Sequence, residues 1–304
     1  MSNLSKSIPL GIKTPAEARA KLIGILCALI VVVLFAGFTL VSRLGFTTSL
    51  GLIDIAALRF GIGGMLLLPI FVKYGFSGLR WQQAVILALL GGLGFALFAY
   101  TGFSLAPASH GAVLLHGTLS LFTFAIVFFS TDQRIKRGQI VGLLLVALGV
   151  VAMAWDSLSS ATVRQLMGDG SLLLASLCWS TYGVVVRRLG LAPARAASIV
   201  AVLSMCCFIP IYIALPGKML LSASWHELLL QGVFQGALLG AFSIFIYTRA
   251  VVLLGAAETA LFTAAVPCLT TILAIPLLSE FPTPAAIVGV VIVTVGMIVS
   301  MRSA

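Results

Sequence analysis

The stretch "YTGFSLAPASHGAVLL" (residues 100–115) aligns without a gap with "YTRAVVLLGAAETALF" (residues 247–262), which lies 147 positions further along the chain. The same offset carries "IVGLLLVALG" (140–149) onto "IVGVVIVTVG" (287–296). Each match is weak by itself, because an apolar composition produces chance identities. Their shared frame nevertheless predicts an internal repeat.

Two earlier matches extend the repeat at smaller offsets. The segment "LVSRLG" (40–45) faces "VVRRLG" (185–190), and "PIFV" (69–72) faces "PIYI" (210–213). All four matches follow one another in the same order in both halves of the chain. The two copies therefore cover most of the sequence between them.

The composition is that of a membrane protein. Of the 304 residues, 61% are hydrophobic and only 9% are charged, whereas a soluble domain carries about 25% charged residues. The net charge of +10 comes from basic residues in short gaps between apolar runs, without interleaved aromatic residues. We therefore expect membrane lipid to surround the chain and exclude nucleic acid as a partner.

Ten apolar runs are long enough to cross about 30 Å of hydrocarbon. The first run is longer than the 7–15 residues of a signal-peptide core, so we expect it to be a retained spanning helix. The short gaps leave no room for a soluble catalytic domain. The runs are 22–42, 52–72, 84–105, 110–129, 138–156, 170–189, 196–215, 228–252, 257–277 and 284–301.

The distribution of Lys and Arg predicts the orientation. Of the 18 basic residues, fourteen fall on the side of the membrane that holds both termini and three on the other side, while Arg59 lies within the second span. Positive charges concentrate on the cytoplasmic side. We therefore expect both termini in the cytoplasm, with residues 1–21 as a cytoplasmic tail and residues 157–169 as a periplasmic linker.

Each copy of the repeat holds five spans, which is an odd number. The second copy must therefore enter the membrane from the opposite side, as an inverted repeat. The predicted fold is an all-α integral membrane protein with ten transmembrane helices, in repeats at 22–156 and 170–304. Inverted repeats are typical of secondary transporters, which bind substrate near the bilayer midplane between the repeats.

Two segments resemble signatures of the drug/metabolite transporter superfamily, EamA type. "AALRFGIG" (56–63) resembles the Arg-aromatic signature of helix 2, and residues 260–299 are similar to the helix 9–10 signature, including Pro267 and Glu280. The first copy departs from the pattern, since Ser120 stands where the family usually has proline.

The resemblance implies a multi-pass transporter of the bacterial inner membrane. Within the superfamily, the apolar interior with Tyr and Trp looks most like the YddG-type aromatic amino-acid exporters.

His116 is the most informative polar residue of the fourth span. It lies about six residues into the helix, or roughly 9 Å below the outer surface, where polar groups usually face a bundle interior or a wet cavity. It either binds a substrate carboxylate or a proton, or is a neutral histidine hydrogen-bonded to a neighbouring helix. His110 points about 120° away from it, so the two cannot form an i,i+4 metal pair, and we interpret His110 as interfacial.

Aromatic residues near the midplane are further candidates. Trp179 and Tyr182 lie one turn apart in the sixth span, and Phe35 and Phe38 occupy the matching part of the first span. Tyr100 and Tyr247 are repeat mates that we expect to close opposite mouths of one cavity, with ordinary packing as the alternative. The candidate substrate-binding residues are Phe35, Phe38, Tyr100, His116, Trp179, Tyr182, Ser243 and Tyr247.

Other charged residues have structural interpretations. We expect Arg59 to be an anchor that extends toward the surface with Asp54 as a partner, an anion contact being the alternative. Glu258 opens the ninth span, where an acidic side chain favours the helix dipole, and Glu280 lies at the membrane boundary.

Pairs of glycines seven residues apart predict close helix packing. Gly142 and Gly149 in the fifth span, with Gly289 and Gly296 in the tenth, should bring these two helices together away from the substrate path. "GVFQGALLG" (232–240) contains two overlapping GxxxG units, for which helix packing is the default interpretation.

We expect no enzyme activity, cofactor or metal site. The chain lacks GxxxxGK[ST], HExxH and GxSxG motifs, so neither ATP binding nor hydrolysis is indicated. The five cysteines all lie in apolar runs and are interpreted as small apolar fillers.

The predicted function is a secondary transporter that exports small metabolites, amino acids first and aromatic ones favoured, by alternating access. Proton exchange and downhill efflux stay open as energy sources, and a monomer is the simplest assembly. The alternatives are a carrier of drug cations or nucleotide sugars, and a membrane channel or structural subunit.

Overall fold

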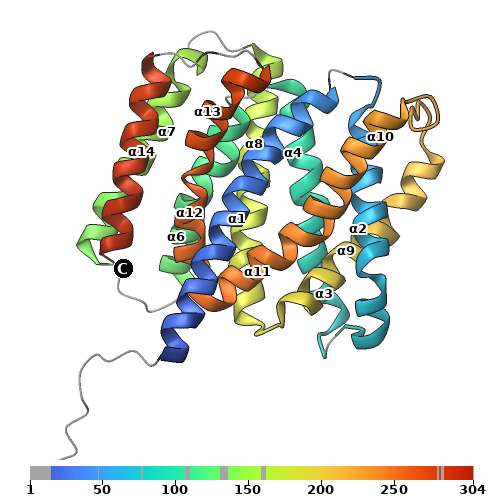
Figure 1. The fold of residues 1–304 in the computed structure, drawn as a ribbon, viewed down its shortest axis with the longest axis horizontal. Coiled ribbons are helices and arrows are strands. Elements are labelled where there is room, and N and C mark those ends of the chain that lie inside the picture. The colour runs from blue at the N-terminus through green and yellow to red at the C-terminus, as the bar shows by residue number, and fades with distance from the viewer. Residues whose placement is uncertain are drawn as a thin grey trace, which may run out of the picture.

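The computed structural model describes residues 15–46, 48–76, 78–106, 110–130, 136–158, 162–278, 281 and 284–303. All regular structure within these ranges is helical (Figure 1). The all-helical class predicted from the apolar runs is therefore confirmed. Glu280 lies outside the described residues.

Helices cover the ten predicted apolar runs, although the run 257–277 is interrupted between Thr263 and Val266 and the runs 170–189 and 196–215 extend one residue past the ends of their helices. Three segments, η1 to η3, are π-helical turns inside longer helices. The first half consists of α1 (Pro15–Phe46), α2 (Leu52–Tyr74), α3 (Trp81–Ala88), η1 (Leu89–Leu93), α4 (Gly94–Leu105), η2 (Gly111–Gly117), α6 (Thr118–Ser130) and α7 (Arg137–Leu158). The second half consists of α8 (Val163–Arg188), α9 (Pro193–Ala214), α10 (Trp225–Gln231), η3 (Gly232–Phe242), α11 (Ser243–Leu254), α12 (Ala256–Thr263), α13 (Val266–Leu278) and α14 (Pro284–Arg302).

Eight of these runs are long and apolar enough to cross a membrane. The runs predicted at 138–156 and 284–301 lie in α7 and α14, whose apolar stretches are the shorter Arg137–Ala152 and Ile287–Ser300. The structure thus describes a multi-pass membrane protein, and the count of ten spans stays a prediction.

Two helices begin before the apolar runs predicted for them. Helix α1 begins at Pro15, so part of the expected tail is helical, and α8 begins at Val163 inside the expected linker 157–169. The side chain of Thr162 caps α8 by accepting a hydrogen bond from the backbone N–H of Gln165. This part of α8 lies outside the predicted apolar run because it contains charged residues. In the structure Asp169 is accommodated there by a buried partner, His110.

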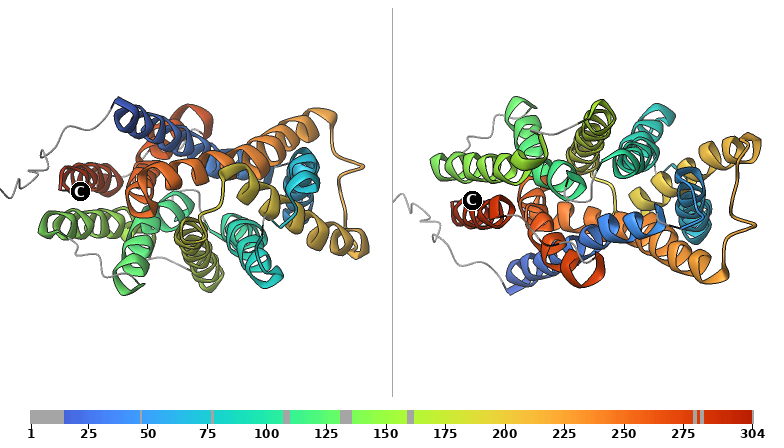
Figure 2. Two further views of the ribbon diagram at one scale, coloured as in Figure 1. Left: turned by 90° about the horizontal axis from the view of Figure 1, so that it is seen from below. Right: turned by 90° about the horizontal axis from the view of Figure 1, so that it is seen from above.

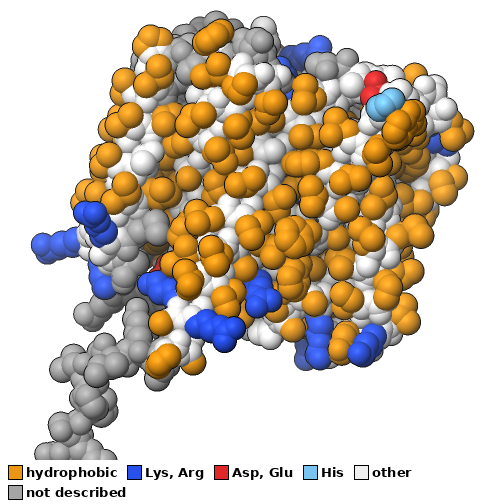
Figure 3. Space-filling model, in the orientation of Figure 1, with side chains coloured by type: hydrophobic (Ala, Val, Ile, Leu, Met, Phe, Trp, Pro, Cys, Tyr) orange, Lys and Arg blue, Asp and Glu red, His pale blue; other side chains and the backbone are white. Residues whose placement is uncertain are grey.

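The helices stand side by side and form an elongated bundle when seen end-on (Figure 2). Helix α1 begins at the same end of the bundle at which α14 finishes, and we call this the terminal end (Figure 1). On the face shown in Figure 3, Lys and Arg gather mainly at the terminal end, while hydrophobic side chains cover the middle. This arrangement fits an orientation set by positive charge.

Helix packing follows the pairing of the two halves. Helix α1 packs on α11 and α13, and α8 packs in the same way on α4 and α6. Helix α2 packs on its mate α9, and α7 packs on its mate α14. The first helix of each half therefore packs on later helices of the other half, so the halves are interleaved.

The close packing of the fifth and tenth spans through glycines is confirmed. A Cβ atom at Gly142 would lie 2.6 Å from the carbonyl oxygen of Gly296, and one at Gly149 would lie 2.8 Å from that of Gly289. These distances are too short for any larger residue. Backbone therefore contacts backbone along α7 and α14.

Candidate functional site

A group of aromatic side chains fills the interior between α1, α4, η2, α8 and α11. Trp179 lies at its centre and is fully buried. The ring of Trp179 lies 4.5 Å from Phe95, 4.9 Å from Tyr247, 5.3 Å from Tyr182 and 5.6 Å from Phe35, centroid to centroid. We call this group the aromatic cluster; its members are Phe35, Phe38, Phe95, Tyr100, Phe103, His116, Trp179, Tyr182 and Tyr247.

The one-turn spacing seen in the sequence explains how α1 and α8 contribute to the cluster. Residues three apart lie on one helix face, so Phe35 and Phe38 both point into the cluster, as do Trp179 and Tyr182. Phe35 contacts the ring of His116 at 5.1 Å. Phe38 contacts Phe95, Tyr100 and Phe103 at 5.9, 5.7 and 5.1 Å.

The structure thus brings seven of the eight predicted site residues into one contiguous group. Ser243 is different, because its hydroxyl donates a 2.8 Å hydrogen bond to the carbonyl oxygen of Leu239 on its own helical run. Ser243 is buried, and this bond within its own helical run is the hydrogen bond described for its hydroxyl. Whether any of the eight binds substrate stays a prediction.

The two repeat-mate tyrosines differ in their hydroxyl groups. Tyr100 donates a 2.9 Å hydrogen bond to Oε1 of Gln235 in η3, and Nε2 of Gln235 donates a 3.0 Å bond to Ser42 in α1. The hydroxyl of Tyr247 is buried without a partner among the described residues. The packing interpretation with a satisfied hydroxyl therefore fits Tyr100 and not Tyr247.

Several buried polar atoms of the cluster and its edge lack a hydrogen-bond partner within the described ranges. They are both ring nitrogens of His116, Nε1 of Trp179, the hydroxyl of Tyr247 and Nη1 of Arg59. An unpaired buried polar group costs about 1–3 kcal/mol. Such groups are rare in native interiors, so a concentration of them needs an explanation such as a ligand. For His116, a hydrogen bond to a neighbouring helix, the alternative to a cavity role, is wrong here.

Arg59 lies where the sequence analysis did not expect it. Its side chain is only 2% exposed, and its guanidinium carbon lies 5.2 Å from the ring centroid of Phe38 and 5.6 Å from that of Phe95. Both contacts are of the cation–π kind. The prediction that Arg59 extends toward the surface is therefore wrong.

Asp54 is not the partner of Arg59. Five residues turn a helix by about 500°, so the two side chains point about 140° apart. Oδ1 of Asp54 instead accepts hydrogen bonds from the hydroxyl of Tyr212 at 2.7 Å and from the backbone N–H of Met219 at 3.1 Å. Oδ2 accepts from the N–H of Gly51 at 3.0 Å.

Phe95, Phe103 and Gln235 were missed by the sequence analysis. A signal existed for Gln235, because an amide inside an apolar run is unusual at membrane depth. It lies within "GVFQGALLG", which the sequence analysis interpreted as a helix-packing motif because of its glycines. That packing prediction is confirmed: a Cβ at Gly240 would lie 2.5 Å from the carbonyl oxygen of Arg59.

The helices around the cluster are irregular at matching places. The repeat offset of 147 carries η1 (Leu89–Leu93) onto positions 236–240, which lie inside η3 (Gly232–Phe242). It also carries η2 onto positions 258–264, which end at the break between α12 and α13. Such π turns occur frequently at functional sites.

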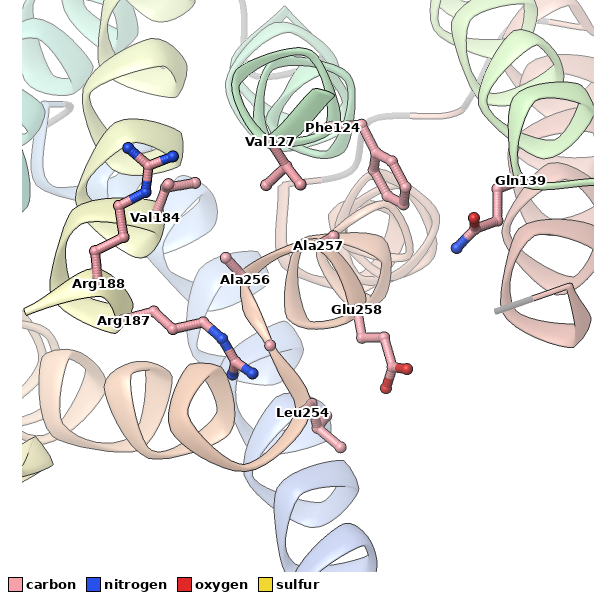
Figure 4. A pocket seen from close by; sticks show the side chains of 11 residues that line it. Phe124, Val127, Gln139, Val184, Arg187, Arg188, Leu254, Ala256, Ala257 and Glu258 are labelled. Atoms are coloured by element: carbon pink, nitrogen blue, oxygen red, sulfur yellow. The ribbon is translucent and has the colours of Figure 1, made fainter. Parts of the chain in front are cut away.

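A hollow of about 530 Å³ opens at the terminal end, between α6, α8 and the start of α12 (Figure 4). Arg187, Arg188 and Glu258 line it. Glu258 lies in the first turn of α12, as predicted. Val184 of α8 also lines the hollow. Because α8 rises about 1.5 Å per residue, the hollow begins roughly 7.5 Å from Trp179 along that helix.

Arginines at both ends bind the carbonyl ends of helices. At the terminal end, Nη1 of Arg187 donates to the carbonyl oxygen of Val251 in α11, at 2.5 Å. At the other end, Nη1 of Arg43 in α1 donates to that of Ala106, which follows α4, at 3.4 Å. The segments "LVSRLG" and "VVRRLG" that supply them are repeat mates.

A buried hydrogen bond joins His110 to Asp169. Their Nδ1 and Oδ1 atoms are 2.6 Å apart, and both side chains are less than one-tenth exposed. The interpretation of His110 as merely interfacial is therefore wrong. Within the ranges that the structure describes, no three His, Cys, Asp or Glu side chains lie close enough to hold a metal ion.

Comparison with known proteins agrees with this architecture. The model of the EamA-like transporter family matches residues 22–155 and 166–302. A relative from Clostridium kluyveri, described as an uncharacterized transporter, is 26% identical over 264 residues, which cover 80% of this chain and 81% of the relative. The uncharacterized transporter YyaM of Bacillus subtilis is 26% identical over 145 residues; the match spans 44% of this chain and 46% of that relative.

A solved crystal structure, described only as that of a protein, shares the fold. Its TM-score is 0.66 at 18% identity, and the match covers 93% of this chain and 98% of that one. Together the two family matches span nearly the whole described region. The chain therefore belongs to the EamA-like transporter family.

Proposed function

We propose that this protein is a secondary transporter that exports small metabolites, with aromatic amino acids as the favoured substrates. The observation that carries the proposal is the aromatic cluster, because it combines flat apolar rings with buried polar atoms that have no partner among the described residues. Aromatic rings stack on the side chain of such a substrate. The unpartnered atoms are available to its amino and carboxylate groups.

The place of the cluster supports alternating access. Its rings come from helices of both halves, so movement of one half against the other opens or closes it. Arg43 and Arg187 fasten equivalent helix ends on opposite sides of the cluster. We further propose that the protein lies in a bacterial inner membrane with both termini in the cytoplasm. Its ten spans form two inverted five-helix repeats. The two ranges matched by the family model support the division into repeats.

The state described here fits a carrier closed around its site. Trp179 and Tyr247 are fully buried, and the hollow at the terminal end stops short of them. In the proposed orientation this hollow faces the cytoplasm, from which an exporter takes up its substrate. Opening of this side would require the bond of Arg187 to α11 to break.

Reconstitution in liposomes tests the proposal. We expect saturable uptake and counterflow of labelled tryptophan and phenylalanine, with slower transport of leucine. Repeating the assay with and without a pH gradient separates proton exchange from downhill efflux. A panel that includes ethidium and a nucleotide sugar tests the other carrier classes. Transport of these compounds in place of aromatic amino acids would contradict the proposal. Flux that does not saturate and shows no counterflow would indicate a channel and would contradict it as well.

A further inference from the structure

We propose that Arg59 binds the carboxylate of the transported substrate, so that the carrier selects aromatic compounds with a negative charge. This inference rests on the proposed function. Arg59 belongs to α2, and its guanidinium lies against Phe38 and Phe95. Because Phe95 contacts Trp179 at 4.5 Å, the positive charge is one ring away from the centre of the cluster.

The first argument is the missing counter-ion. Among the described residues, both buried acids already have partners. Asp54 accepts hydrogen bonds from the N–H of Gly51, the hydroxyl of Tyr212 and the N–H of Met219, and Asp169 pairs with His110. Nη1 of Arg59 is buried and has no hydrogen-bond partner within this part of the chain. Membrane-embedded charges are usually paired or functional. A substrate anion would supply the pair.

The second argument is the surroundings of the guanidinium. The ring of Phe38 lies 5.2 Å from the guanidinium carbon of Arg59, and Phe38 also contacts Tyr100, whose single hydroxyl proton goes to Gln235. Nη1 of Arg59 has no partner among the described residues, so it remains for a ligand. The planar fork of Arg suits a carboxylate, which it binds through two parallel hydrogen bonds.

The third argument is that an aromatic surface lies directly beside the charge. Phe95 contacts both the guanidinium of Arg59, at 5.6 Å, and the ring of Trp179, at 4.5 Å. The carboxylate and the aromatic side chain of an amino acid leave the same α-carbon, so a substrate bound at Arg59 places its ring against Phe95 and Trp179.

A purely structural role predicts something different. If Arg59 only holds α2 against Phe38 and Phe95, its loss would lower stability and overall transport for every compound alike. A binding role changes the preference among compounds. The ratio of affinities is therefore the decisive readout.

The experiment measures binding of labelled tryptophan to purified protein, with tryptamine and indole-3-propionate as competitors. Tryptamine lacks the carboxylate, and indole-3-propionate lacks the amino group. In the wild type we expect indole-3-propionate to compete and tryptamine to compete at least about tenfold less well, since hydrogen bonds to a charged group are worth about 1.5–3 kcal/mol.

Arg59→Gln should weaken tryptophan binding by about tenfold or more and abolish the preference over tryptamine. Arg59→Lys keeps the charge and should retain the preference with weaker binding. Arg195→Gln is the matched control, because Arg195 also lies over a ring, that of Tyr74 at 4.4 Å, outside the cluster. It should bind like the wild type.

The outcomes separate the two proposals. Wild-type protein that binds tryptophan, with an unchanged preference in Arg59→Gln, overturns the role of Arg59 and leaves the proposed function intact. Wild-type protein that binds none of the three compounds overturns the proposed function and the substrate class with it. If Arg59→Gln does not fold, Arg59→Lys decides the question: tryptophan binding as tight as that of the wild type in this variant overturns the role of Arg59.

Discussion

Tyr100 and Gln235 form a buried hydrogen bond of 2.9 Å across the middle of the molecule. They come from equivalent helical runs of the two halves, α3–η1–α4 and α10–η3–α11. Nε2 of Gln235 also donates a hydrogen bond to Ser42 in α1. Three helices are thus linked by one side-chain amide in an otherwise apolar interior.

Gln235→Leu should therefore lower the thermal stability of the purified protein. The change removes both hydrogen bonds and leaves the Tyr100 hydroxyl buried without a partner, at a cost of about 1–3 kcal/mol. Unfolding in detergent, followed with a thiol-reactive dye or by intrinsic fluorescence, measures the effect. Gln82→Leu is the control, because Gln82 is exposed on α3. Equal melting temperatures for the two variants would show that the amide has no structural role.

Trp179→Ala and His116→Ala should each impair transport of aromatic amino acids in liposomes. Trp179 supplies four of the ring contacts that hold the cluster together. Aromatic pairs contribute about 0.5–1.5 kcal/mol each beyond their buried area. Trp179→Phe should recover part of the rate. Trp225→Ala, at a side chain that is 64% exposed, should behave like the wild type. Wild-type rates in both cluster variants would remove the site from this place.

Gly142→Leu should destabilise the protein strongly, because the new side chain has only the backbone of α14 to occupy. The expected result is poor expression, or a melting temperature lowered by several degrees, since overpacking costs about 1–3 kcal/mol. Gly170→Leu is the matched control; nothing lies within 4 Å of a Cβ at Gly170. A tolerated Gly142→Leu would mean that α7 and α14 are not held in backbone contact.

Arg187→Ala should make the cytoplasmic side of the carrier more accessible in the proposed orientation. The variant loses the bond to the carbonyl end of α11. Arg43→Ala removes the equivalent bond at the other end and should have the opposite effect. Labelling of a cysteine introduced at Val184, which lines the hollow, reports the change in a background without native cysteines. Identical labelling in both variants would contradict the proposal that Arg187 and Arg43 hold the two sides of the carrier closed.

The inverted topology can be checked with cysteines at positions 136 and 192. The first precedes α7, and the second precedes α9. With ten spans and inverted halves, both should react with a membrane-impermeant reagent from the cytoplasmic side. Reaction from opposite sides would disprove the repeat, whatever the substrate.

Much of the architecture could be predicted from the sequence because membrane helices leave strong signals. Hydropathy located every helical run, and the glycine pairs correctly joined α7 to α14. The errors came from polar residues. Asp169 was assigned to a linker because its charge interrupts the apolar pattern, and only the fold reveals that His110 lies within reach.

The site was predicted in part for a similar reason. Aromatic residues one turn apart marked the faces of α1 and α8 that point inward. Phe95 and Phe103 carry no such mark, since phenylalanine is equally common facing lipid. The direction of the Arg59 side chain depends on which helices surround α2, and the repeat alone does not determine this.

The π turns η1 and η3 mean that no single helical wheel describes either of these membrane crossings. A π turn closes its hydrogen bonds one residue later than an α-turn, so the helix faces before and after it are out of phase. Spectroscopic or labelling scans along residues 81–105 and 225–254 should show a periodicity that breaks within positions 89–93 and 232–242. Each of these helices thereby presents one side to its neighbours near one membrane surface and a different side near the other.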